Sequence, residues 1–170
     1  MNTKKLTILS LLLAISLSLH FLESLIPPLI AVPGMKLGLA NIITLVSLCF
    51  LTRKETFLLL FLRITLGAVF GGSVVSFWYS FAGGFLCFIT EIIIFKFFKG
   101  NQLWILSTFG AISHNIGQIL VAVYITKTTA IIWYIIPLII SGILSGAFTG
   151  FVTQYLLLRN DKLFEKLIKK

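Results

Sequence analysis

The sequence contains little charge, and acidic residues are its scarcest component. Of the 170 residues 11% are charged, only five are Asp or Glu, and Asp161 is the only aspartate. A paired-aspartate magnesium site of the kind used in diphosphate chemistry therefore cannot be built. The nucleotide-binding pattern G-x-x-x-x-G-K-[ST] and the hydrolase pattern G-x-S-x-G are both absent. We therefore expect a protein that is not an enzyme and does not itself use ATP.

Thiols and potential metal ligands are also few. Two cysteines, Cys49 and Cys87, and two histidines, His20 and His114, show no metal-ligand spacing with the acidic residues. Both cysteines fall inside long apolar segments, where a thiol behaves as a small apolar side chain. The sequence accordingly predicts no metal site and no bound cofactor.

Apolar residues are what the chain has in abundance. They make up 58% of it, and the mean hydropathy is +1.07, which is typical of an integral membrane protein and not of a soluble domain. A helix needs about 20 apolar residues to cross a bilayer, so we expect one all-α domain over residues 1–170, a bundle of six transmembrane helices. The net charge of +9 is better explained by membrane topology than by nucleic-acid binding, because the basic residues lie at the ends of apolar segments.

Prolines, glycines and charged runs divide the chain into these six spans. Pro27 and Pro28 end the first, and short polar runs such as TRKE at 52–55 and TKTT at 126–129 separate later ones. The spans are predicted at residues 5–26, 36–52, 56–72, 73–98, 103–126 and 130–158.

The distribution of Lys and Arg predicts the orientation of the bundle. With the N-terminus inside, the outer ends carry only Lys36 and Lys127. Because positive residues favour the cytoplasmic side, we expect a multi-pass protein of the cell membrane with both termini in the cytoplasm. The residues assigned to the cytoplasmic ends are Lys4, Lys5, Arg53, Lys54, Lys96, Lys99, Arg159, Lys162, Lys166, Lys169 and Lys170.

Two opposite charges lie at matching depths in neighbouring spans. Arg63 and Glu91 are both about seven residues from a cytoplasmic end, or roughly 10 Å deep at 1.5 Å per residue. Charged groups in a bilayer are costly unless they are paired or hydrated. We expect Arg63 and Glu91 to form a buried structural ion pair; the alternative is that both line a cavity.

A second group of polar residues falls in the outer half of the predicted bundle. Lys36 and Asn41 open the second span, and His114, Asn115 and Gln118 lie near the middle of the fifth. We expect these five to line a pocket that opens outward and binds a small molecule, preferably an anionic or electron-rich aromatic one, because Lys36 would be its strongest cation. The alternative for Lys36 is a topology anchor whose ammonium reaches the lipid headgroups.

Aromatic residues near the outer ends could complete this pocket. Trp78 and Tyr79 lie near the outer end of the fourth span, where either ring could pack against a ligand. The alternative is an interfacial belt, which is the common role of Trp and Tyr at such a depth.

Rows of small residues recur at four-residue spacing. Gly142, Gly146 and Gly150 form one row in the sixth span, and Gly67 and Gly71 repeat the spacing in the third. Such rows let helix backbones approach closely, so we expect them to be packing seams. A similar row in the first span can receive a helix of a partner protein; it consists of Ser10, Ala14 and Ser18.

Three stretches, PGMKLGLANIITL at 33–45, LRITLGAVFGG at 62–72 and GAISHNIGQ at 110–118, resemble the membrane family called heptaprenyl diphosphate synthase component I, or the Gx transporter family. That family is similar to the substrate-binding S components of energy-coupling factor (ECF) transporters. The motif residues carried over from the family are Lys36, Gly38, Asn41, Arg63, His114, Asn115 and Gln118.

The resemblance implies a subunit that captures a small vitamin-like, quinone-related or isoprenoid-related molecule from outside. Its partners would be a transmembrane T component and two ATPase subunits, which would use the ATP. The family's enzymatic name implies a second role, that of a non-catalytic membrane accessory protein in polyprenyl diphosphate or menaquinone biosynthesis.

Overall fold

The computed structural model of the chain describes residues 3–25, 38–71, 74–97 and 102–168, with side chains up to residue 159. All regular structure in this part is helical, which confirms the predicted all-α class. The elements are α1 (Thr3–Ser24), α2 (Leu39–Phe50), α3 (Arg53–Gly71), α4 (Val74–Phe95), α5 (Leu103–Thr126), the 3₁₀ helix η1 (Thr129–Tyr134) and α6 (Ile135–Ile168).

Within the described residues, four segments are long and apolar enough to cross a membrane: α1, α4, α5 and the segment Thr129–Arg159 that joins η1 to most of α6. The chain thus has the character of a membrane protein. The fifth predicted span matches α5 residue for residue, whereas α2, at 12 residues, is about 18 Å long and shorter than the roughly 30 Å of a bilayer core. The first turn of α3 is charged. Crossing by α2 and α3 therefore stays a prediction.

The surface of the bundle is unusually apolar for a protein in water. Many large apolar side chains face outward, with Phe21 65% and Phe70 80% exposed, although others, such as Leu59, form a buried core. Small hydroxyl residues are buried inside, and Ser16, Thr56 and Thr153 are 0% exposed. This arrangement suits a lipid surrounding, because lipid solvates the outer apolar side chains while the polar groups bond within the protein.

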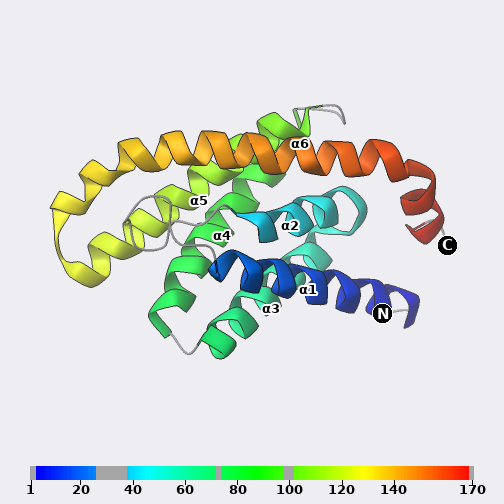
Figure 1. Cartoon of the computed structure of the whole chain (residues 1–170), viewed down its shortest axis with the longest axis horizontal. Coiled ribbons are helices and arrows are strands. Elements are labelled where there is room, and N and C mark those ends of the chain that lie inside the picture. Colours follow the sequence, from blue (N-terminus) through cyan, green and yellow to red (C-terminus); the bar gives the residue numbers. More distant parts are fainter. Residues whose placement is uncertain (1–2, 26–37, 72–73, 98–101, 169–170) are drawn as a thin grey trace.

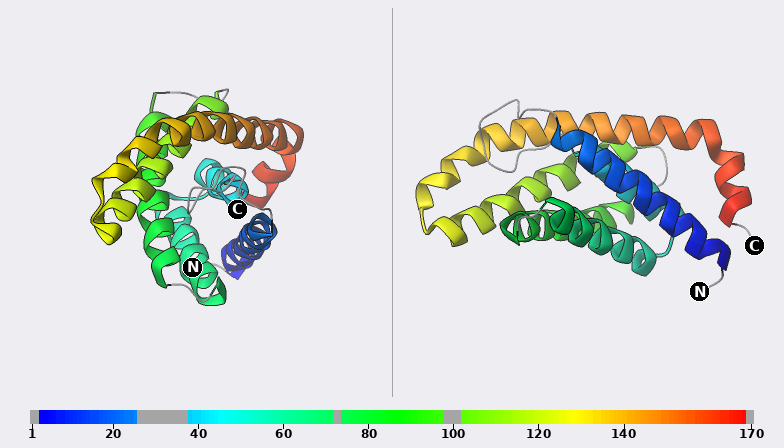
Figure 2. Two further views of the ribbon diagram at one scale, coloured as in Figure 1. Left: turned by 60° about the vertical axis from the view of Figure 1, so that its left-hand side comes forward. Right: turned by 60° about the horizontal axis from the view of Figure 1, so that its bottom comes forward.

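The short helix α2 occupies the middle of the bundle. Figures 1 and 2 show it between α1 and α6, and most of its residues are buried, from Ala40 to Leu48. A helix that is apolar on all sides is stable only when protein or lipid surrounds it. Both ends of the described chain lie at the same end of the bundle in Figures 1 and 2.

The junctions of α2 with its neighbours follow from local sequence. Gly38, just before α2, has φ 77°, a left-handed conformation that glycine adopts without a Cβ clash. At the start of α3, Thr52 and Glu55 form a capping box: the Thr52 N–H donates to Glu55 Oε2 at 2.9 Å and the Glu55 N–H to Thr52 Oγ1 at 3.3 Å. Glu55 also accepts from Lys5 Nζ at 3.3 Å, which connects α3 to α1.

The glycine row of α6 packs against α5. A Cβ added at Gly146 would lie 2.6 Å from Thr108 Cα, and one at Gly150 2.4 Å from Trp104 Cα. The predicted seam is therefore confirmed for α6. The row in α3 is only half confirmed, since Gly67 packs against His20 while a Cβ at Gly71 would meet nothing within 4 Å.

Candidate functional site

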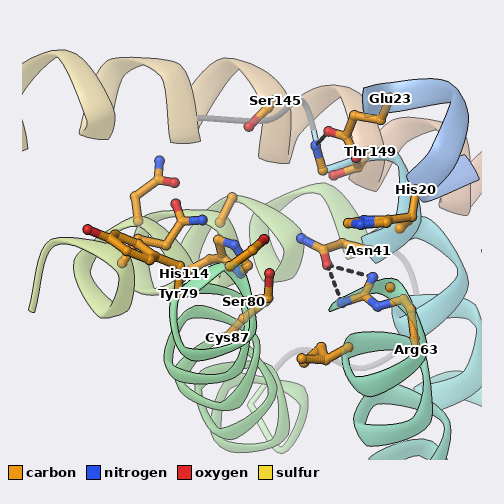
Figure 3. A pocket seen from close by; sticks show the side chains of 18 of the residues that line it. His20, Glu23, Asn41, Arg63, Tyr79, Ser80, Cys87, His114, Ser145 and Thr149 are labelled. Carbon is orange, nitrogen blue, oxygen red and sulfur yellow. Dashed lines mark hydrogen bonds between the residues drawn. The ribbon is translucent and has the colours of Figure 1, made fainter. Parts of the chain in front are cut away.

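A pocket of about 90 Å³ lies among the six α-helices, and each of them contributes to its wall (Figure 3). For its size the wall is rich in polar and ionisable groups, which is the mark of a binding site in an otherwise apolar bundle. The polar and ionisable side chains on the wall are His20, Glu23, Asn41, Arg63, Ser76, Tyr79, Ser80, Cys87, Glu91, Ser107, His114, Asn115, Gln118, Ser145 and Thr149.

Arg63 and Asn41 form one side of this wall. Arg63 is 6% exposed, and its two terminal nitrogens donate to Asn41 Oδ1 at 3.1 and 3.2 Å (Figure 3). Asn41 is held in turn by the turn before α2, where its backbone N–H donates to the Gly38 carbonyl at 2.8 Å. Two donors converge on one oxygen, so the guanidinium has further N–H groups that can bind an acceptor in the pocket.

The predicted ion pair between Arg63 and Glu91 is not formed, and this is a correction. No salt bridge joins these two described residues, and Arg63 donates to Asn41 instead. Glu91 is 2% exposed and accepts only a weak contact from Cys87 Sγ at 3.5 Å. The alternative is the correct one, because both charged residues line the pocket. The expected depth in the bilayer is the same for both residues, but depth does not determine the direction in which either side chain points.

The polar motif of α5 contributes three side chains to the pocket, as predicted: His114, Asn115 and Gln118. Asn115 Nδ2 donates to the Leu138 carbonyl of α6 at 2.7 Å, and this bond fixes the amide at the pocket edge. Close backbone approach makes room for them, since a Cβ at Gly83 would lie 3.0 Å from His114 Nε2.

The two aromatic candidates of α4 lie in different surroundings. Tyr79 lies on the pocket wall (Figure 3), whereas Trp78 is 53% exposed and is not part of it. Consecutive residues of a helix point about 100° apart, so only one of the two can face the interior. The structure does not place Trp78 on the pocket wall, and its exposure fits the interfacial alternative.

The C-terminal end of α1 supplies two residues that were not predicted as ligand contacts. His20 and Glu23 lie on the wall, and a Glu23 carboxylate oxygen accepts a hydrogen bond from the Gly38 backbone N–H. The signal for them was present in the sequence, because ionisable residues inside a predicted span are functional candidates by default.

The predicted preference for an anionic ligand rests on Lys36 and stays a prediction. Lys36 lies outside the described residues, and Arg63 shares the wall with two carboxyl groups, those of Glu23 and Glu91. The described wall therefore offers both signs of charge.

The predicted docking row of α1 lies on the surface. Ser10, Ala14 and Ser18 are exposed in the described structure, beside exposed Leu11 and Ile15. The row faces away from the bundle and is accessible to another helix.

A family model described as heptaprenyl diphosphate synthase component I matches residues 12–156. The chain belongs to the heptaprenyl diphosphate synthase component I family. The match runs from α1 to α6 and includes every pocket residue, and the words component I imply work with other subunits. Neither a curated protein nor a solved structure matches the chain.

Proposed function

We propose that this member of the heptaprenyl diphosphate synthase component I family is a substrate-binding membrane subunit, similar in role to the S component of an ECF-type importer. The observation that carries the proposal is the polar pocket shared by all six α-helices. A bundle in lipid gains nothing from gathering a guanidinium, two carboxyls and two imidazoles in one cavity unless they bind something. The sequence has no nucleotide-binding pattern, so energy for transport would come from partner ATPases.

The wall suggests how a small molecule is held. An acceptor or anionic group would meet the remaining N–H donors of Arg63, beside Asn41. The amides of Asn115 and Gln118 supply directional hydrogen bonds, and the Tyr79 ring gives an aromatic surface. A cavity of about 90 Å³ is small beside the 300–1,000 Å³ typical of drug-sized ligands, which favours a compact vitamin-like molecule or an isoprenoid or quinone precursor.

Partner association would use the exposed face of α1. Ser10, Ala14 and Ser18 form a shallow row between larger apolar side chains, a surface against which another membrane helix packs closely. The expected partners are a transmembrane T component and ATPase subunits.

The orientation belongs to the same proposal. We infer six crossings of the cell membrane with both termini in the cytoplasm, from the distribution of Lys and Arg and from the position of both chain ends at one end of the bundle. Thr128 and Gln102 are exposed sites at opposite ends of α5. Single cysteines introduced there, with Cys49 and Cys87 replaced by Ala, should react with an impermeant maleimide from outside at 128 only.

Binding without catalysis is the decisive experiment for this function. The purified chain, in detergent or nanodiscs, is screened by thermal shift against vitamins, quinone precursors and isoprenoid phosphates. A ligand that binds only the folded state stabilises it by RT ln(1 + [L]/Kd), so the apparent melting temperature rises with ligand concentration. We expect at least one class to do so while the chain alone hydrolyses no ATP; the absence of any stabilising compound would reject a binding subunit.

The family's description favours a second candidate, an accessory role beside a prenyl diphosphate synthase. In that case the chain would co-purify with a soluble prenyltransferase and alter its product length or membrane association. Purification from the native membrane separates the two: an ATPase module favours transport, and a prenyltransferase favours the accessory role.

A further inference from the structure

Glu91 is a buried acidic residue whose hydrogen bonding is incomplete in the described part of the chain. Its side chain is 2% exposed on the pocket wall, and Oε2 has no hydrogen-bond partner among the described residues. Oε1 receives only the Cys87 thiol, a weak donor, at 3.5 Å. A carboxyl group in such a place is expensive to keep unless a strong donor reaches it at some stage of the protein's work.

Among the described residues, no neighbour of Glu91 supplies that donor. Arg63, on the same wall, bonds Asn41, and none of its other N–H groups bonds Oε2 of Glu91. On the other side α5 approaches so closely that a Cβ at Gly110 would lie 2.9 Å from Glu91 Oε1. The close packing at Gly110 limits access to the carboxyl from that side, whereas the pocket, which Glu91 lines, is a direction from which a donor can approach.

We propose that the ligand carries a protonated nitrogen that binds Glu91, and an anionic or acceptor group that binds Arg63. A protonated amine, amidine or guanidine is the natural partner of a buried carboxylate, because a charge-assisted hydrogen bond satisfies both the charge and the lone pairs. The pocket thus selects compact amphoteric molecules. The inference rests on the proposed function, since it names the ligand class of the same site.

The test uses matched compounds. The probes are ω-amino acids from glycine to 6-aminohexanoate, together with 4-(aminomethyl)benzoate, whose ring can contact Tyr79. Each is paired with the carboxylic acid that lacks the nitrogen. Dissociation constants are measured by titration calorimetry on the purified chain. At the favoured length, we expect the amino compound to bind at least about tenfold tighter than its acid partner, as one charge-assisted bond allows.

Variants of Glu91 identify the group responsible. Glu91→Gln should remove the preference for the nitrogen, measured as the ratio of the dissociation constants of the acid and its amino partner. Glu91→Asp keeps the charge and should retain the preference at lower affinity, which covers the case in which Glu91→Gln does not fold. Glu55→Gln is the matched control, because Glu55 lies outside the pocket and should change neither affinity.

Each outcome decides between the two proposals. Acid partners that bind as tightly as the amino compounds, or a preference that survives in Glu91→Gln, would overturn the inference and leave the binding function intact. A thermal-shift screen whose best compound has no protonatable nitrogen would also overturn the inference and leave the binding function intact. If no compound of any class binds, the binding function fails and this inference fails with it.

Discussion

The guanidinium of Arg63 in α3 and the side-chain oxygen of Asn41 in α2 are joined by two hydrogen bonds, of 3.1 and 3.2 Å. The pair gives the buried cation a partner without neutralising it. A carboxylate in place of Asn41 would cancel the charge, whereas an amide oxygen leaves it available to a ligand.

Asn41→Ala should therefore destabilise the fold, because the buried guanidinium loses its partner. We expect the free energy of unfolding to fall by about 2–4 kcal/mol, measured by denaturant titration in mixed micelles. Asn41→Asp should keep stability near that of the parent but weaken binding of any anionic ligand. Equal stability of Asn41→Ala and the parent would show that Arg63 has another partner.

The helix seam between α5 and α6 should tolerate no added methyl group. Gly150→Ala would place a Cβ 2.4 Å from Trp104 Cα, and overpacking of this kind costs about 1–3 kcal/mol. Gly71→Ala is the matched control, since its Cβ would meet nothing within 4 Å and alanine favours a helix. Similar melting temperatures for the two variants would contradict the described packing.

Tyr79 and Trp78 offer adjacent residues with opposite expected effects on binding. Tyr79→Leu removes a ring from the pocket wall and should weaken binding of an aromatic ligand by about three- to tenfold. Trp78→Leu should leave the dissociation constant unchanged, because Trp78 faces outward. Calorimetric titration of both variants makes the comparison, and loss of affinity in Trp78→Leu would reverse the assignment.

Stability should depend on pH through the capping box of α3. The hydrogen bond from the Thr52 backbone N–H holds the pKa of the Glu55 carboxyl below its ordinary value. Because the folded-state pKa is the lower one, the stabilisation is complete above the ordinary pKa and is lost as pH falls through the lowered value.

Glu55→Gln should therefore cost about 0.5–1 kcal/mol at neutral pH and less at about pH 3. Free energies of unfolding of parent and variant over this pH range provide the measurement. If the difference in free energy between parent and variant grew as the pH fell, the pKa of Glu55 would not be lowered in the folded state.

Bulky residues on the exposed row of α1 should weaken partner association. Ala14→Leu and Ser18→Leu fill the row, so less ATPase module should co-purify with the chain, while ligand binding by the isolated chain is unchanged. Ala130→Leu, at an exposed position of η1, is the control. Undiminished co-purification would reject α1 as the docking face.

Much of the fold could be predicted because lipid imposes simple rules. Long apolar runs ended by Pro, Gly or charge predicted the helices well, and α5 was placed exactly at residues 103–126. The sequence did not reveal that α2 is a short, buried central helix, since a run of apolar residues looks the same whether lipid or protein surrounds it. It also missed the T-x-x-E signal at Thr52, which predicts a helix start at that position.

The site was predictable at the level of residue type. Asn41, Tyr79, His114, Asn115 and Gln118 were expected in the pocket and line it. The errors concern the direction in which a side chain points, which its position in the sequence does not determine. Arg63 and Glu91 were expected at one depth, but no ion pair joins them, and Trp78 is one residue from Tyr79 but points outward.

The geometry of α1 has a mechanical consequence. One unbroken helix of 22 residues, about 33 Å long, carries the exposed row near its beginning and middle and two pocket residues, His20 and Glu23, at its far end. A helix of this length moves as a stiff rod. On the proposal that a partner docks on this row, tilting the part that holds Ala14 would displace the last turn, and with it the Glu23 carboxylate that accepts from the Gly38 backbone before Asn41. A movement imposed at the surface of α1 would thereby reach the cavity through this one helix.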